Sequence, residues 1–396
     1  MVLGMKLWKK NYVLNKQVEG FTVGNDYLLD QQLVKYDCTA SIAHAKMLQK
    51  IGVLTKKECA ETISALKEII ALDKGKKFQV KQEDEDSHTA IENYLVKKLG
   101  SAGKKIHTGR SRNDQVIAAL RLYYKDEIAS VTNLIGALTD SLDSFSGKYG
   151  FVQLPGYTHM KKAMPSSIGL WAGAFVDSMK DNKVLLLDSL KLIDQCPLGS
   201  GAGYGVPLKV DKKLTAKLLG FKKVQENPIY VQNSRGKFES SVLHCLSQVM
   251  LDLNKMASDL LLFSMQEFGF FELSQELCTG SSIMPHKKNQ DVLEIIRANY
   301  HLIISFEFQV KSLIANLISG YNRDMQLTKE PVIKGFEVVK NSLQAMALVI
   351  DNIKVNEKNC QKAMTKELFA AQKAYELVKE GVPFRDAYKK IARELA

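Results

Sequence analysis

Hydrophobic residues recur at steps of three to five positions, with one step of seven in the third series, along three long, proline-free segments of the chain. This spacing places apolar side chains on one helix face, so it predicts helices of roughly 30 residues, against a usual length of about 11–12. The series are Val116, Leu120, Tyr123, Ile128, Val131, Ile135, Leu138, Leu142 and Phe145; Val242, Leu246, Val249, Leu253, Met256, Leu260 and Phe263; and Val292, Ile295, Leu302, Phe306, Val310, Leu313 and Leu317. We attribute all three to core packing, which predicts a helix bundle.

Four polar clusters lie where these helices are expected to begin or end. They read HTGRSRNDQV (107–116), LPGYTHMKKAMPSS (154–167), CTGSSIMPHKKNQD (278–291) and SGYNRDMQLTKEP (319–331). Because loops at helix ends often contain functional groups while the helices supply rigidity, we expect the active groups here. No alternating run is long enough to predict a substantial sheet, and no apolar run reaches the ~18–20 residues of a membrane span.

The first cluster favours a bound anion. Arg110 and Arg112 offer forked donors suited to carboxylates, and Ser111 and Asn113 add neutral hydrogen bonds. The N–H groups at a helix start favour negative charge as well. The alternative is that Ser111, Asn113 or Asp114 only caps the helix while the arginines are solvated.

Histidines in polar loops are the candidates for proton transfer near neutral pH. His159, beside Thr158, and His286 lie in such loops, whereas His44, His244 and His301 fall within helical patterns and are expected to serve packing or the surface. For His88, in QEDEDSHTAIEN, we expect hydrogen bonds to the neighbouring acids. The chain has no metal-ligand spacing such as HExxH, so no metal is expected.

The third cluster combines a hydroxyl with cationic and amide donors. Ser281 would need positive surroundings to lose its own proton. Lys287 and Asn289 could hold an oxyanion formed during a reaction. Glu294 could orient His159 or simply favour the helix dipole. The alternative is a solvated lysine-rich loop that caps the next helix. The cluster contains no GxSxG or GxxxxGK[ST] motif.

Charge and cysteine content limit the kinds of ligand and cell compartment that we expect. The net charge of +12 could serve nucleic acid or small anionic substrates. The basic residues are spread along the chain without an aromatic-basic motif, which favours small anions. The six cysteines form no CxxC pair, as is typical of reduced thiols in a cytoplasm. The first residues lack the apolar core of a signal peptide.

Several motifs together resemble a known family. GSSIMPHKKN is similar to the GSSxMPxKxN loop of the fumarase/aspartase superfamily. IHTGRSRNDQV, LPGYTH and YNRDMQLTKEP resemble the argininosuccinate lyases in particular, and SIAHAKML (41–48) and GVPFRDAYKKI (381–391) fit the same family. The resemblance implies cofactor-free cleavage of argininosuccinate to arginine and fumarate.

The resemblance also implies architecture: a mostly α fold with an N-terminal domain (1–113), a central bundle of long helices (114–358) and a small C-terminal helical domain (359–396). It further implies a homotetramer in which each active site is shared, assembled from three subunits. Family members usually continue past the segment matching PFRDAYKKI, so a shortened C-terminal domain is expected. LWKKNY (7–12) stands where many members have LWGGRF, so its packing is expected to differ, and KKAMPSS replaces the commoner QRAQP.

By the same resemblance, Ser281 matches the general base and His159 the acid that protonates the leaving nitrogen, with Glu294 as its charge partner. Lys287 and Asn289 match the groups that stabilise the intermediate. The matched substrate-binding residues are Ser111, Arg112, Asn113 and Thr158 for the carboxylates, with Tyr321, Gln326 and Lys329 for the arginine and carboxylate portions. Three rivals remain: a lyase for another succinylated substrate of the adenylosuccinate type, a catalytically silent crystallin-like homologue, and a nucleic-acid-binding protein.

Overall fold

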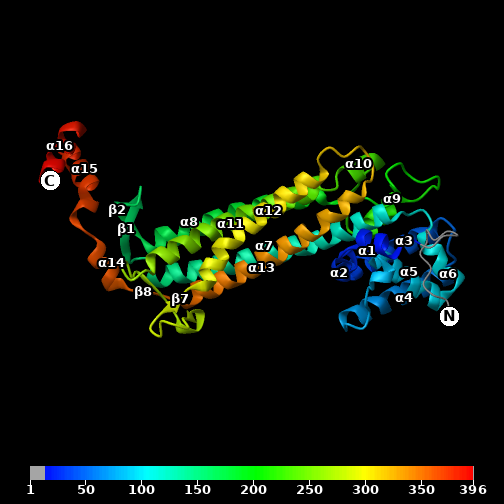
Figure 1. Cartoon of the computed structure of the whole chain (residues 1–396). Helices are drawn as coiled ribbons and strands as arrows, with labels where there is room; N and C mark the ends of the chain where they lie inside the picture. Colours follow the sequence, from blue (N-terminus) through cyan, green and yellow to red (C-terminus); the bar gives the residue numbers. More distant parts are fainter. Residues whose placement is uncertain (1–13, 396) are drawn as a thin grey trace. The chain divides into compact units, whose positions relative to one another are not determined.

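The computed structural model describes residues 14–395, and it confirms the predicted mostly α fold (Figure 1). The segment LWKKNY lies outside the described residues. Within residues 14–395, no helix combines the length and apolar character that a membrane crossing requires.

The α-helices are α1 Lys16–Val23, α2 Asp26–Asp30, α3 Val34–Lys50, α4 Lys56–Lys74, α5 Ser87–Leu99, α6 Ser101–Lys104, α7 Arg112–Tyr149, α8 Ile168–Ile193, α9 Lys212–Leu218, α10 Pro228–Asn233, α11 Lys237–Phe263, α12 Asp291–Ile314, α13 Lys329–Asn352, α14 Glu357–Ala363, α15 Ala370–Lys379 and α16 Phe384–Leu395. Short 3₁₀ turns are η1 Gln31–Leu33, η2 Gln82–Asp84, η3 Lys105–His107, η4 Gln275–Leu277, η5 Arg323–Thr328 and η6 Lys366–Phe369. The strands are β1 Gln153–Thr158, β2 Lys161–Ser167, β3 Gln195–Cys196, β4 Lys223–Val224, β5 Phe271–Leu273, β6 Thr279–Gly280, β7 Lys288–Asn289 and β8 Ile353–Val355.

The three apolar series lie on α7, α11 and α12, apart from Leu317, which follows the end of α12, so each predicted long helix is confirmed. All of the α11 series is buried, and so is the α7 series from Leu120 onward. The assignment of α12 to core packing is wrong in part, because Ile295 and Leu302 are 60% and 46% exposed. The buried side of α12 instead presents Leu293, Ile296 and Ile303.

The described chain divides into two compact units. The first contains the residues up to Ser130, Leu186–Cys245 and Ile304–Phe336; the second contains Val131–Leu185, Leu246–Ile303 and the residues from Glu337 onward. Five long helices (α7, α8, α11, α12 and α13) each contribute a segment to both units. Each unit therefore joins three separate stretches of sequence, and the predicted division at 113 and 358 stays a prediction.

The first unit has a core between α3, α4 and α5, built from buried side chains such as Leu48, Leu66 and Leu95. Local chemistry sets where α4 starts. The Thr55 hydroxyl accepts a hydrogen bond from the Glu58 N–H at 3.2 Å, and the Glu58 carboxylate accepts one from the Thr55 N–H at 2.8 Å. This reciprocal pair satisfies two N–H groups that the helix leaves unpaired.

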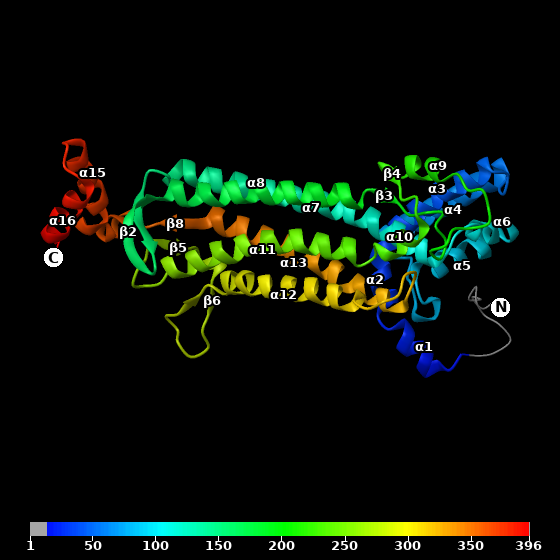
Figure 2. The same ribbon diagram turned by 90° about the horizontal axis from the view of Figure 1, so that it is seen from above.

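The second unit packs segments of the long helices side by side (Figures 1 and 2). Aromatic rings fill its interior: Trp171 lies 5.5 Å from Phe271 and 6.4 Å from Phe145 between ring centroids. The Trp171 indole N–H also donates to Asp259 Oδ2 at 3.0 Å. Buried indoles usually need such a partner, so the contact fixes the orientation of the ring.

The polar stretch 154–167, expected as a loop, forms most of an antiparallel hairpin of β1 and β2. Pro155 and Pro165 face each other in the register, which a two-stranded sheet tolerates because proline avoids only interior ladder positions. The Lys162 ammonium donates to the Ala363 carbonyl at 2.8 Å and ties the hairpin to the end of α14. Within residues 14–395 all sheets have two strands, as expected for this chain.

Candidate active site

A cavity of about 260 Å³ in the first unit contains five of the predicted substrate-binding residues: Arg112, Asn113, Tyr321, Gln326 and Lys329. We call it the charged cavity. Its other lining residues are Val23, Asp26, Asp30, Glu85, Asp86, His88, Val116, Arg235 and Arg323. Carboxylates and cations are both abundant in this wall, so the cavity suits a ligand with charges of both signs.

Lys329 is buried in this wall between two aspartates. Its ammonium lies 2.8 Å from Asp26 Oδ1 and also forms an ion pair with Asp30. Burial alone would lower the pKa of Lys329, but the two carboxylates offset that effect and the net pKa is raised. The pKa of Asp30 is lowered, because the nearby ammonium outweighs the effect of burial. The lysine is therefore held charged inside the protein.

Arg112 is already bound to protein groups. Its guanidinium donates to Glu85 Oε2 at 3.0 Å and to the Thr89 hydroxyl at 2.6 Å, and it lies 3.3 Å from Asp86 Oδ2. Gln326 likewise donates its amide N–H to the Thr22 carbonyl at 3.1 Å. Both roles in substrate binding stay predictions.

Ser111 and Asp114 organise the first turn of α7. The Ser111 hydroxyl accepts from the Asn113 N–H at 3.3 Å, so this residue does act as a helix cap. Asp114 Oδ1 accepts from the Ser111 N–H at 2.9 Å, and Oδ2 accepts from the N–H groups of Gly199 and Gly201 at 3.1 and 2.9 Å. Burial raises the pKa of Asp114 to about 6, although these hydrogen bonds oppose the rise.

The expected hydrogen bonds of His88 to the acids beside it in sequence are wrong. The Nδ1 of His88 lies 2.5 Å from Asp37 Oδ2 on α3, and its Nε2 is buried without a hydrogen-bond partner among the described residues. Burial would lower the pKa of His88, but Asp37 outweighs it and the net pKa is raised. Neither this pair nor Asp26 and Asp30 had a recognisable sequence signal.

The second unit holds the residues to which the sequence assigns chemistry. Thr158 ends β1, and His159 and Met160 form the turn of the β1–β2 hairpin with φ values of 51° and 59°. Two consecutive positive φ values are typical of tight hairpin turns, and non-glycine residues adopt them at a cost. Thr158 and His159 are both exposed.

Ser281 and Lys287 lie on the loop that joins β6 and β7, and Asn289 is the last residue of β7. The Ser281 hydroxyl accepts from the Met284 N–H at 3.1 Å, and the Asn289 amide donates to the Gly280 carbonyl at 3.3 Å. Lys287 is exposed. Figures 1 and 2 show this loop and the β1–β2 hairpin as separate projections of the second unit.

Glu294 lies in the first turn of α12 and is exposed. Among residues 14–395, neither Glu294 nor His159 uses its side chain in a hydrogen bond to another protein group, so the predicted pair stays a prediction. His286, the other loop histidine, is exposed on the β6–β7 loop.

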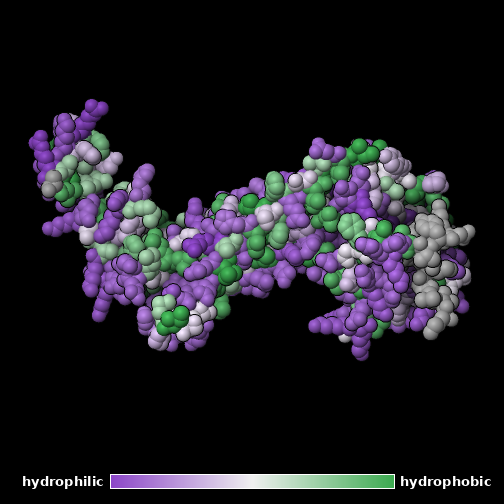
Figure 3. Space-filling view, in the orientation of Figure 1, coloured by the Kyte–Doolittle hydropathy of each residue, from purple (hydrophilic) through white to green (hydrophobic). Residues whose placement is uncertain are grey.

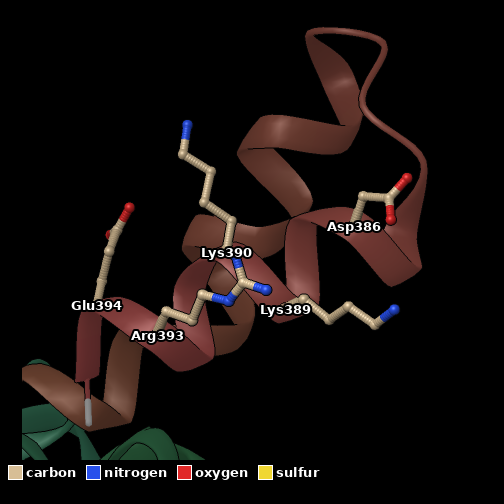
Figure 4. A pocket seen from close by; sticks show the side chains of 5 residues that line it. All are labelled: Asp386, Lys389, Lys390, Arg393 and Glu394. Carbon is tan, nitrogen blue, oxygen red and sulfur yellow. The ribbon is translucent and has the colours of Figure 1, made fainter.

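A hollow on the surface of α16 offers a contrast to the charged cavity. Figure 4 shows Asp386, Lys389, Lys390, Arg393 and Glu394 extending from this one helix. All five are exposed, and none is a predicted site residue. Across the described part of the chain, no group of three or more His, Cys, Asp or Glu residues could hold a metal ion.

Comparison with known proteins shows which family the chain resembles in sequence. Residues 18–304 match the family model described as "Lyase". Argininosuccinate lyase from Thermotoga neapolitana is 54% identical over 98% of this chain and 98% of its own length. The enzyme of the same name from Phocaeicola vulgatus is 42% identical over 99% of this chain and 88% of its own length.

Solved structures agree on the fold. The fumarate lyase:delta crystallin from Brucella melitensis is 19% identical, with a TM-score of 0.82 over 96% of this chain and 88% of that chain. EDDS lyase in complex with formate is 23% identical, with a TM-score of 0.79 over 94% of this chain and 74% of that chain. These two likenesses concern the fold alone. The chain belongs to the lyase family because residues 18–304, well over half of it, match the family model. Within that family its place is among the argininosuccinate lyases, as the identity to curated relatives over nearly its whole length shows.

Proposed function

We propose that this protein cleaves argininosuccinate reversibly to L-arginine and fumarate, as a step in arginine biosynthesis. The observation that carries the proposal is the charged cavity, which gathers five predicted substrate-binding residues with four carboxylates in one wall. Argininosuccinate itself combines carboxylates, a guanidinium group and an ammonium group. A cavity with cations and anions in fixed positions complements such a molecule better than a cavity of one charge.

The chemistry starts at the succinyl part. Ser281, as an alkoxide, removes a proton from Cβ, and the electron pair spreads into the adjacent carboxylate. That pair then forms the carbon–carbon double bond as the carbon–nitrogen bond breaks, and His159 protonates the departing nitrogen. Lys287 and Asn289 stabilise the extra negative charge, and Glu294 orients His159. No cofactor takes part in this scheme.

Binding of the substrate is assigned to two sets of groups. Ser111, Arg112, Asn113 and Thr158 bind its carboxylates; Tyr321, Gln326 and Lys329 contact the arginine portion and a carboxylate. Among these, the Asn113 amide and the Tyr321 hydroxyl make no side-chain hydrogen bond to another described residue. Their donors are therefore available to a ligand without breaking protein contacts.

We further propose a homotetramer whose active sites combine residues from different copies. Support comes from α12, where Ile295, Leu302 and Phe308 are 60%, 46% and 72% exposed. Figure 3 shows hydrophobic side chains at the surface along the long helices. Large exposed apolar side chains along one helix are typical of an interface. Light scattering of the purified protein tests this state directly, and a monomer at micromolar concentration would contradict it.

A cytoplasmic location completes the proposal. All six cysteines are free thiols, and five of them are buried, which suits a reducing compartment.

The direct test of the activity mixes purified protein with argininosuccinate and follows fumarate by ultraviolet absorbance. We expect fumarate and arginine in equal amounts, without added metal or cofactor. Fumarate from adenylosuccinate but none from argininosuccinate would move the protein to the adenylosuccinate-type lyases. A folded tetramer that releases fumarate from neither substrate would be a silent structural homologue.

A further inference from the structure

Arg235 is a buried cation in the wall of the charged cavity, and the motifs of the sequence did not include it. The residue is 4% exposed. Within residues 14–395 its guanidinium forms no ion pair and no hydrogen bond, and its Nε is fully buried. A buried charge without a partner is costly, so natural proteins rarely keep one without a use.

The other cations of the cavity are committed to protein groups. Lys329 pairs with Asp26 and Asp30, and Arg112 pairs with Glu85 and Asp86. Arg323 donates to the Thr22 carbonyl at 2.9 Å. Arg235 is therefore the one cationic side chain lining this cavity whose donors are all free within the described chain.

Opposite charges act on Arg235 only at a distance. Burial raises the pKa values of Asp26 and Glu239, and the positive charge of Arg235 is among the influences that lower them. The Glu239 carboxylate instead accepts a hydrogen bond from the Gly236 N–H at 2.6 Å. Neither carboxylate uses the hydrogen-bonding capacity of the Arg235 guanidinium.

The backbone holds Arg235 in place. Gly236 follows it with φ of +80°, and a Cβ at this position would lie 2.3 Å from the Ile314 side chain. The Arg235 N–H also donates to the Gln232 carbonyl at 3.0 Å. Nearby, Asn233 accepts from the Gly320 N–H at 3.0 Å, which anchors the segment that contains Tyr321. The guanidinium is thus presented to the cavity by a rigid turn.

We propose that Arg235 binds a carboxylate group of the substrate inside the charged cavity. The planar fork of arginine matches a carboxylate with two parallel hydrogen bonds. Asn113 and Tyr321, which line the same cavity, offer further free donors. The identity of the substrate rests on the function proposed above, whereas the carboxylate class rests on the geometry of Arg235 alone.

The test compares Arg235→Gln and Arg235→Lys with a matched control, Lys237→Gln, which removes one positive charge at an exposed position outside the cavity. Three quantities are measured: kcat and KM for argininosuccinate, the melting temperature without ligand, and the rise in melting temperature caused by succinate. Succinate is a dicarboxylate that the enzyme cannot cleave.

For Arg235→Gln we expect a KM raised about 10- to 100-fold, as for the loss of hydrogen bonds to a charged group. The unliganded melting temperature should stay equal or rise, because an unpaired buried charge has been removed. The succinate-induced rise should disappear. Arg235→Lys keeps the charge without the fork and should lie between wild type and Arg235→Gln, and the control should match wild type.

Four results would overturn the proposal: an unchanged KM, a preserved succinate effect in Arg235→Gln, no succinate effect in the wild type, or a large loss of unliganded stability in Arg235→Gln. The last would mark Arg235 as a structural residue. A wild type that cleaves no argininosuccinate would refute the proposed function instead, and the succinate comparison would still decide the role of Arg235.

Discussion

The two groups of predicted site residues occupy different surroundings. Those of the first unit, apart from Ser111, line a cavity in which Lys329 and Arg112 are bound to protein carboxylates. Those of the second unit, apart from Glu294 on α12, lie on two hairpins, where His159 and Lys287 are exposed to solvent. Burial and ion pairs prepare the binding groups in advance. Of the two groups assigned to proton transfer, His159 is exposed and Ser281 is half-buried. A serine hydroxyl in contact with water does not ionise at neutral pH.

This difference indicates what the exposed hairpins still require. Electrostatic stabilisation of a developing charge is strong only where water is excluded. We therefore infer that another copy of the chain covers the hairpins in the active assembly.

The largest expected effect is on turnover in Ser281→Ala. Loss of a general base typically costs about 10²–10⁴-fold in rate, so we expect kcat to fall by that order while the melting temperature stays within a few degrees. The adjacent Ser282→Ala is the matched control and should retain most of its activity. Near wild-type kcat in Ser281→Ala would remove this residue from the mechanism.

The next largest effect is on the free energy of unfolding, and it distinguishes variants at two lysines. Lys329→Met leaves Asp26 and Asp30 buried without their counter-charge, so we expect a loss of about 3–5 kcal/mol in the free energy of unfolding. Lys287→Met alters an exposed side chain and should leave stability nearly unchanged while turnover falls. Urea unfolding of both variants measures the difference. Equal stability losses would mean that the two regions do not differ as described.

A smaller expected effect is on the pH dependence of stability, through Asp114, which is buried in the first unit. Its raised pKa, about 6 against 3.8 when unperturbed, means that the native state binds a proton between these values and the unfolded state does not. Stability from this group is therefore present at low pH and lost as pH rises through about 6. Relative to Asp114→Asn, the wild type should lose on the order of 2–3 kcal/mol between pH 4 and pH 6. A flat difference over this range would contradict the assignment.

Much of the fold could be predicted from the chain, and particular residues show where prediction ended. The α7 and α11 series predicted buried faces correctly because apolar spacing reports a helix face directly. On α12 the same spacing selected Ile295 and Leu302, which are exposed, because periodicity alone does not distinguish a buried apolar face from an exposed one. The β1–β2 hairpin was missed because Pro155 and Gly156 resemble loop signals.

Within the site, short motifs identified Arg112 and Asn113 because their neighbours in sequence are also neighbours in space. His88 was assigned to adjacent acids, whereas its partner Asp37 lies on another helix. Arg235 lies in no motif, and its significance depends on burial and on missing partners, which only coordinates reveal. Distant ion pairs leave no local pattern, so such residues have to be found in the structure.

The central claim is that the cavity residues and the hairpin residues act together from different copies of the chain. Two variants test it: Asn113→Ala, which changes the cavity, and His159→Asn, which removes the acid while asparagine tolerates the left-handed backbone of that turn. Each alone should be nearly inactive. When the two variants are denatured together and refolded as mixed tetramers, we expect about a quarter of wild-type activity. If each site takes Asn113 from one copy and His159 from another, random assortment leaves both residues intact in about a quarter of the sites. No recovery in mixed tetramers would contradict the claim, because each site would then come from one chain.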